Sequence, residues 1–136
     1  LENAIAYAEK IISQAIALRD QNSGNKNRSI LKTAVDFIDS HYMEEDMSLN
    51  KAANAANVSA NHFSALFSQN MGQTFIEYLT NLRMNKAKEY LRCTSMRSSE
   101  IAGEIGYKDA HYFSYLFKKT QGMTPSDYRK AREDKA

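Results

Sequence analysis

Residues 63–78 read FSALFSQNMGQTFIEY and residues 113–128 read FSYLFKKTQGMTPSDY, so the second half of the chain contains one pattern twice. Both copies have a Phe-Ser-x-Leu-Phe run, followed at equal spacings by a Gly, a Thr and a Tyr, 50 positions apart. Repeats at a fixed period indicate the fold, but a solenoid needs about three or more units. Two copies therefore indicate one supersecondary motif used in tandem. The match extends upstream through Ala52 with Ala102 and Ala60 with Ala110.

The residues around each Phe-Ser-x-Leu-Phe run predict a helix with defined ends. Ser59 and Asp109 are suited to cap its start, and Gly72 and Gly122 to end it. Its large apolar residues fall at i, i+3 and i+4, which places them on one buried face. A shorter helix and a tight turn, such as Asn57-Val58, are expected before it. The sequence therefore predicts a helix-turn-helix in each copy.

The whole chain is predicted to be all-α, because it has one Pro and no run of β-branched residues. We expect residues 1–28 to be a linker helix and a loop, and residues 29–132 to form a domain of about seven helices, two helix-turn-helix subdomains joined by a long linking helix. Ser98 or Ser99 is expected to cap the first helix of the second copy. The expected elements are a first helix-turn-helix at about 48–70, the linking helix at about 75–92, a second helix-turn-helix at about 98–120 and a last helix at about 125–134.

Charge is distributed unevenly along the sequence, although the net charge is only +2. Residues 79–132 hold eleven Lys and Arg against five acidic residues, whereas residues 1–78 hold six against nine. Such asymmetry indicates a basic surface that faces a polyanion. A solvated helical face gives the same charge pattern, so both interpretations stay open at this point.

Several classes of protein have no support in the sequence. A single cysteine, Cys93, excludes an intramolecular disulfide and a multi-cysteine zinc site, and it fits a reducing, cytoplasmic location. No apolar run reaches the ~18 residues of a membrane span, and we expect no signal peptide. His41, His62 and His111 lack partners at metal-ligand spacing, and there is no Gly-rich phosphate loop. We therefore expect no enzyme activity, no cofactor and no metal. Because the chain begins at Leu1, we expect it to be a fragment.

The second helix of each copy must bury one face and offers the other to a partner. The outward residues are small or can form hydrogen bonds, as the reading of base edges in the major groove requires. The candidates for base contact are Ala60, Asn61, Ser64, Ala65, Ala110, His111, Ser114 and Tyr115. The candidates for phosphate contact are His62, Ser68, Lys108, Tyr112, Lys118, Lys119 and Arg129. For His62 and Tyr112 packing on a neighbouring helix stays open, and Arg83 is expected to have a structural or phosphate role.

A family resemblance is carried by Ile101-Ala102, Ile105-Gly106-Tyr107, Leu116-Phe117-Lys118-Lys119, Gly122-Met123-Thr124-Pro125 and Tyr128-Arg129. In these motifs, residues 29–132 resemble the DNA-binding domain of AraC/XylS-type transcription regulators, most of all the subgroup fused to two-component receiver domains. The resemblance implies seven helices in two subdomains and sequence-specific binding of double-stranded DNA that regulates transcription. Where the family often has Arg or Lys, this chain has Ala65, Ser68 and Gln69, so the first copy is expected to contribute less electrostatic affinity.

The partners expected from this reading are promoter or operator DNA and no membrane. The linking helix, at about 18 residues, is ~27 Å long, and successive major grooves on one face of DNA are ~34 Å apart. We therefore expect the two reading helices to enter adjacent major grooves. RNA polymerase is a further candidate partner, as is a second copy of the chain, through residues 1–20 or a preceding sensory or receiver module. The alternative function is a protein-interaction module whose basic face meets an acidic partner.

Overall fold

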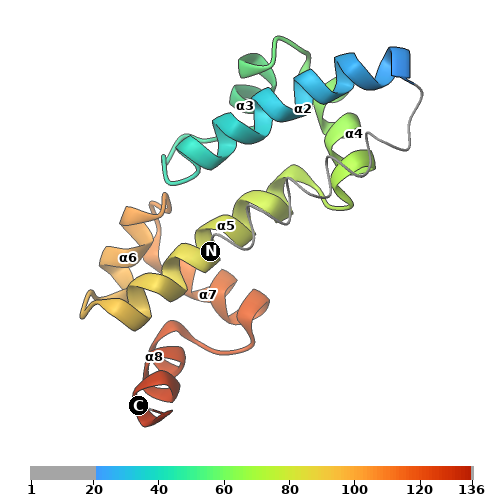
Figure 1. Ribbon diagram of the computed structural model, residues 1–136. Coiled ribbons are helices and arrows are strands. Elements are labelled where there is room, and N and C mark those ends of the chain that lie inside the picture. Colours follow the sequence, from blue (N-terminus) through green and yellow to red (C-terminus); the bar gives the residue numbers. More distant parts are fainter. Residues whose placement is uncertain (1–20, 136) are drawn as a thin grey trace. The chain divides into compact units, whose positions relative to one another are not determined.

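The computed structural model describes residues 21–135, and this part of the chain is entirely helical apart from its connections (Figure 1). The all-α prediction is confirmed for these residues. The linker helix expected over residues 1–20 lies outside them. None of the helices in the described range is long and apolar enough to cross a membrane. The helices are α2 (Gln21–His41), α3 (Leu49–Ala55), α4 (Ala60–Met71), α5 (Phe75–Cys93), α6 (Ser98–Glu104), α7 (Ala110–Gln121) and α8 (Pro125–Lys135).

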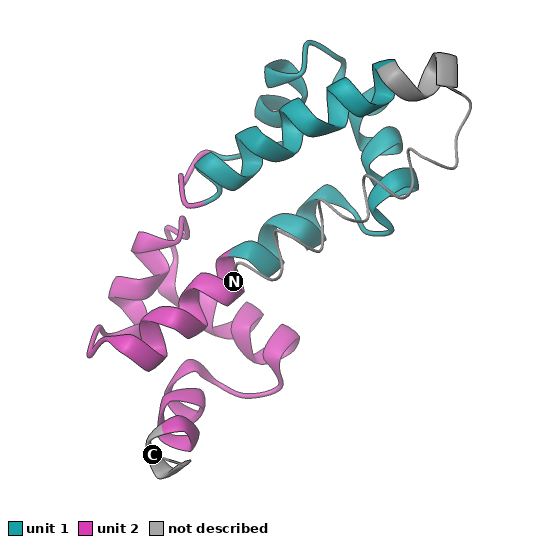
Figure 2. Ribbon diagram, in the orientation of Figure 1, with its two compact units in different colours: residues 1–42, 47–82 teal, residues 43–46, 83–136 magenta. Residues whose placement is uncertain are grey.

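The chain folds into two compact units, each of which contains one helix-turn-helix (Figure 2). The described part of the first unit comprises residues 21–42 and 47–82, and so includes α3 and α4. The second unit comprises residues 43–46 and the chain from Arg83 onward, and so includes α6 and α7. The linking helix α5 begins in the first unit and ends in the second.

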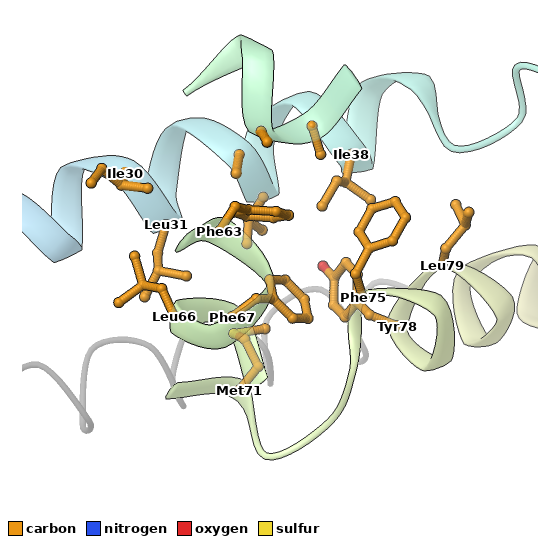
Figure 3. Packing of buried hydrophobic residues seen from close by; sticks show 14 of the residues in the cluster. Ile30, Leu31, Ile38, Phe63, Leu66, Phe67, Met71, Phe75, Tyr78 and Leu79 are labelled. Atoms are coloured by element: carbon orange, nitrogen blue, oxygen red, sulfur yellow. The ribbon is translucent and has the colours of Figure 1, made fainter. Parts of the chain in front are cut away.

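The core of the first unit is built around aromatic rings from α4 and from the start of α5. Phe63 and Phe67 are fully buried, and both meet Phe75, with ring centroids 6.2 and 6.4 Å apart. Figure 3 shows these rings in one cluster with Leu31 and Ile38 of α2. Tyr78 is also buried, but its hydroxyl group donates a hydrogen bond to Asp39 at 2.7 Å. This bond satisfies a polar group that would otherwise be costly to bury.

The second unit has its own core, which uses the same positions of the repeat. Phe113 and Phe117 are fully buried, at the positions that Phe63 and Phe67 occupy in the first copy. They pack with Ile101 and Ile105 and with the buried residues of the second half of α5. The predicted inward face of each second helix is therefore confirmed.

The start of α2 corrects the prediction for residues 22–28. A loop was expected there, with Ser29 as the helix cap, but α2 begins at Gln21 and Ser29 lies inside it. The segment contains no Pro, and its Gly24 costs only about 1 kcal/mol relative to Ala. Once the buried face of α2 holds the helix, each added residue gains a hydrogen bond, so the helix extends through polar residues. The expected loop before residue 29 and the expected cap at Ser29 are wrong for this reason.

The repeat also shifts by one position at the turn. In the first copy the amide of Val58 donates to the carbonyl oxygen of Ala53, and in the second copy Tyr107 donates to Ala102. Ala102 therefore corresponds in structure to Ala53, a spacing of 49, although the residue 50 positions earlier is also an alanine. Between the two helices of each motif, the second copy has one residue more than the first.

The start of α6 differs from prediction as well. Arg97 occupies the cap position and Ser98 is already helical. The amide of Arg97 donates to the carboxylate of Glu100 at 3.3 Å. The carboxylate of Glu100, the third residue of α6, thus stabilises the first turn of the helix. Neither Ser98 nor Ser99 is the cap.

Candidate nucleic-acid interface

The first candidate reading helix, α4, is fixed at both ends by local signals. Ser59 caps its start, where the Ser59 hydroxyl accepts the amide of His62 at 3.1 Å. Gly72 ends it with a φ of 69°. The preceding turn has Asn57 at a φ of 59°, a left-handed conformation that Asn tolerates better than most residues. The position of α4 therefore follows from short-range features that were visible in the sequence.

The solvent-facing side of α4 is small and polar. Asn61, His62 and Ala65 are exposed, while Ser64 and Ser68 are partly buried. Ala60 packs against the first core, so its methyl group is only partly available. Residues 60–71 include no Lys, Arg, Asp or Glu. The candidate surface of α4 therefore offers hydrogen bonds and methyl contacts but no Lys, Arg, Asp or Glu side chain.

The second candidate reading helix, α7, is capped by a carboxylate. Asp109 accepts the amides of His111 at 2.9 Å and Tyr112 at 3.4 Å. An acidic cap also interacts favourably with the positive end of the helix dipole. Gly122, with a φ of 84°, ends the helix. The sequence predicted both ends.

The solvent-facing side of α7 is basic and aromatic. His111, Tyr115, Lys118 and Lys119 are exposed, and Tyr115 is 59% exposed. The ammonium group of Lys119 lies 5.9 Å from the centre of the Tyr115 ring. Ser114 is partly buried, and Ala110, like Ala60 of α4, packs against its own core. This surface combines base-edge donors and acceptors with cations that suit phosphates.

Tyr112 lies in the first turn of α7 and is 51% exposed. Its ring meets the ring of Tyr107 edge-on, with centroids 5.9 Å apart. The ring therefore packs on the preceding turn while about half of the residue faces solvent, and its contact with phosphate stays a prediction.

The connection between α6 and α7 has one residue more than that between α3 and α4, and this additional residue is the charged Lys108. Lys108 precedes the cap Asp109, and its ammonium group lies 3.3 Å from the carboxylate of Glu45. Both side chains are exposed, at 82% and 52%. The sequence predicted Lys108 as a phosphate contact but gave no sign of Glu45, which is distant in the chain.

Arg83 belongs to the interior of the second unit. It is only 6% exposed, its guanidinium group donates to the carbonyl oxygen of Glu44 at 2.8 Å, and it lies 4.9 Å from the centre of the Tyr107 ring. Gly106 has a φ of 105°, and a Cβ atom there would lie 2.8 Å from the same guanidinium group. Of the two roles that the sequence left open for Arg83, these contacts support the structural one.

Arg129 also makes contacts within the second unit. Its guanidinium group donates to the carbonyl oxygens of Leu91 at 3.1 Å and Thr94 at 3.0 Å. Leu91 lies in the last turn of α5, where carbonyl groups lack helical partners. Arg129 thus fastens α8 to the end of the linking helix, and its contact with phosphate stays a prediction.

Among the described residues, no group of three or more His, Cys, Asp or Glu side chains is placed to hold a metal ion. Cys93 is exposed at the end of α5. The candidate DNA-contacting residues lie on α4 in the first unit, and on α7, at Lys108 before it and at Arg129 of α8 in the second unit.

Comparisons with known proteins show which family shares this fold. A family described as a helix-turn-helix domain matches residues 52–131. A transcriptional regulator from Chromobacterium violaceum, described as of the AraC type, is 27% identical, with a TM-score of 0.68 over 83% of this chain and 96% of that one. The chain belongs to the AraC-type family of helix-turn-helix transcription regulators.

Within the AraC-type family, response regulators are similar to this chain. The C-terminal domain of AraT, a response regulator from Geobacillus stearothermophilus, is 40% identical, with a TM-score of 0.74 over 76% of this chain and 85% of that one. The transcriptional regulatory protein YesN of Bacillus subtilis is 32% identical over 91% of this chain but only 29% of its own length. The resemblance to the receiver-fused subgroup is confirmed. The chain spans 12% to 38% of the length of the first three curated relatives.

Proposed function

We propose that this AraC-type domain binds specific sites on double-stranded DNA, with α4 and α7 as its reading helices, and so regulates transcription. One observation carries the proposal. In each unit a short helix and a turn precede a second helix whose aromatic face is buried. The opposite face of that helix is exposed and can form hydrogen bonds, with small and polar residues on α4 and basic and aromatic residues on α7. A helix placed in this way can enter the major groove without losing its own core.

The exposed residues of α4 suit base contact. Asn61 is able to bond adenine in two places, and the methyl group of Ala65 suits contact with a thymine methyl. Ser64 and Ala60 are less accessible and contribute at the edge of the contact. Because α4 lacks Lys and Arg, we expect its half-site to be recognised mainly through hydrogen bonds and shape.

On α7, base reading and phosphate contact come from different positions. His111, Ser114 and Tyr115 are the candidates for base edges, and Lys118 and Lys119 for phosphates. Each phosphate neutralised by a cation releases counterions, so this part of the affinity falls steeply with salt. In the same proposal His62, Ser68 and Tyr112 form further hydrogen bonds to phosphates.

The length of the linking helix supports binding to adjacent major grooves. Helix α5 has 19 residues, which corresponds to about 28 Å at 1.5 Å per residue. Successive grooves on one face of DNA are about 34 Å apart, a distance similar to this length. Since the two motifs follow each other in one chain, the site read by a single chain need not be palindromic.

Selection from a random pool of double-stranded DNA, at two salt concentrations, tests the proposal. We expect an enriched site with two elements about one helical turn apart. Enrichment of one element alone would mean that only one helix reads bases. Equal recovery of all sequences would exclude specific binding and favour the alternative, in which the basic face meets an acidic protein.

We also propose that the domain is joined to another module in its full-length protein, as expected from the share of its relatives that it spans. A dimer through residues 1–20 and a contact with RNA polymerase are part of this wider proposal. Comparing the solution mass of the chain with that of a chain lacking residues 1–20 tests the dimer. A monomer in both cases would exclude a dimer through these residues.

Co-elution of the purified polymerase with the domain on promoter DNA tests the contact with RNA polymerase.

A further inference from the structure

The short acidic loop at residues 43–46 groups with the second unit and not with the helices on either side of it. Its sequence is Met-Glu-Glu-Asp. Two interactions and one close approach hold it against α5 and the turn that precedes α7. Arg83 of α5 donates to the carbonyl oxygen of Glu44, and Glu45 pairs with Lys108. The carbonyl oxygen of Met43 lies beside Gly106, where an added Cβ atom would be 3.0 Å from it.

These contacts hold the backbone of the loop while leaving the Glu45 carboxylate at the surface. The donor to the loop is a buried arginine, whereas the ion pair of Glu45 and Lys108 is exposed at both ends. A loop fixed by buried groups loses little further entropy when its side chain pairs with a neighbour. Glu45 is therefore positioned against Lys108 before any partner arrives.

Lys108 has a special place in the repeat. It belongs to the turn region that is one residue longer in the second copy, and it directly precedes the cap of α7. Because the turn of a helix-turn-helix lies near the DNA backbone when the second helix enters the groove, the proposed function brings this ammonium group close to a phosphate. A carboxylate and a phosphate would then compete for the same cation.

We infer that Glu45 is an internal competitor of DNA, which pairs with Lys108 in the free protein and must release it for a phosphate contact. The inference rests on the proposed function and adds a residue that weakens binding. Glu45 lowers affinity for all sequences alike, because the contact it blocks is to the backbone and not to a base. It also lowers the salt dependence, since a cation already paired with Glu45 contributes less counterion release.

The test measures DNA affinity of the whole chain for its selected site and for random DNA over a range of salt. Replacing Glu45→Gln should tighten binding to both by roughly twofold to fivefold at low salt, the range expected for an exposed ion pair. The slope of log affinity against log salt should become steeper by up to about one. Glu104→Gln is the matched control, because it removes the same charge from an exposed position at the end of α6.

The Lys108→Ala variant separates the effect of the Glu45–Lys108 ion pair from the general effect of removing one negative charge. In that background, Glu45→Gln should give no more gain than Glu104→Gln does. A gain that persists without Lys108, or an equal gain from both Gln variants, would overturn the inference while leaving DNA binding intact. A wild-type chain that binds no DNA at any salt would instead remove the proposed function and the inference with it.

A purely structural role for Glu45 has a different signature. It would lower the unfolding midpoint of Glu45→Gln and loosen DNA binding, because the turn before α7 would lose support. We expect the midpoint to stay close to that of the wild type, since exposed ion pairs add little stability. A lowered midpoint with weakened binding would overturn the inference.

Discussion

Arg83 shows how one buried charge can determine a turn. Its guanidinium group satisfies the Glu44 carbonyl oxygen and lies over the Tyr107 ring. Arg83→Met should therefore lower the free energy of unfolding of the second unit by about 1–3 kcal/mol, because a carbonyl group loses its partner. Arg83→Lys should not restore stability, since an ammonium group lacks the planar fork. Urea denaturation measures both, with exposed Arg132→Met as control.

Gly106 is the second residue at which the turn is fixed. Its φ of 105° is unfavourable for a residue with a side chain. A Cβ atom added at Gly106 would also lie only 2.8 Å from the guanidinium group of Arg83. Gly106→Ala should destabilise the second unit by more than 1 kcal/mol.

Gly103→Ala should have the opposite effect. Gly103 is helical, and a Cβ atom added there would have no neighbour within 4 Å, so Ala should stabilise the second unit by up to about 1 kcal/mol. Equal effects in thermal unfolding would contradict this account.

Residues on the exposed side of α7 should differ in what they control. His111→Ala or Ser114→Ala should change which sequences are preferred, whereas Lys118→Ala should weaken binding to all sequences and reduce the salt slope by about one. Site selection with each variant gives the first result, and titration against random DNA gives the second. The reverse assignment would mean that α7 presents a different face to the groove.

At the scale of elements, α5 begins with a capping box. The amide of Glu77 donates to the Thr74 hydroxyl at 3.1 Å, and the amide of Thr74 donates to the Glu77 carboxylate at 3.0 Å. The backbone hydrogen bond from Thr74, with that from its side chain, holds the pKa of Glu77 below its usual 4.5. The stability that the ionised Glu77 contributes is therefore present above pH 4.5 and is lost as the pH falls through the lowered pKa.

Glu77→Gln tests this contribution, because Gln can fill the same box without titrating. We expect the wild type to be the more stable near neutral pH and the difference to vanish on acidification. Thermal unfolding of both proteins from pH 7 to pH 3 measures it. A difference that does not change with pH would mean that the carboxylate charge adds nothing to the start of α5.

The bounds of helices were predictable where the signal was local. Ser59, Asp109, Gly72 and Gly122 act on neighbouring residues, so the sequence alone placed both ends of α4 and α7. The beginning of α2 was not predictable in this way, because its polar first turns depend on propagation from a buried face.

Contacts between distant residues account for what the sequence could not predict about the candidate site. Glu45 and Lys108 meet across 63 positions, and Arg83 meets Glu44 across 39. Neither pair has a fixed spacing on a helix, so no periodicity reveals them. The shift of the repeat from 50 to 49 was hidden by two adjacent alanines, Ala52 and Ala53, either of which matches Ala102.

At the scale of the whole molecule, the two motifs share a fold but differ in charge. Helix α4 carries no Lys or Arg, whereas α7 carries Lys118 and Lys119 and follows Lys108. If each motif reads its own half-site, affinity should divide into a part that is nearly independent of salt and a part that depends on it strongly. Randomising one half of a selected site at a time separates the two parts.

We expect randomising the α4 half-site to lower affinity while leaving the salt slope of the remaining binding nearly unchanged, because phosphate contacts from α7 persist. Randomising the α7 half-site removes the base contacts that align Lys118 and Lys119 with the DNA phosphates. Affinity should then fall further, and the slope of log affinity against log salt should become shallower. Fluorescence titrations at four or more salt concentrations give both slopes. Equal slopes for the two half-sites would mean that cations outside α7, on the linking helix or α8, carry the electrostatic part of binding.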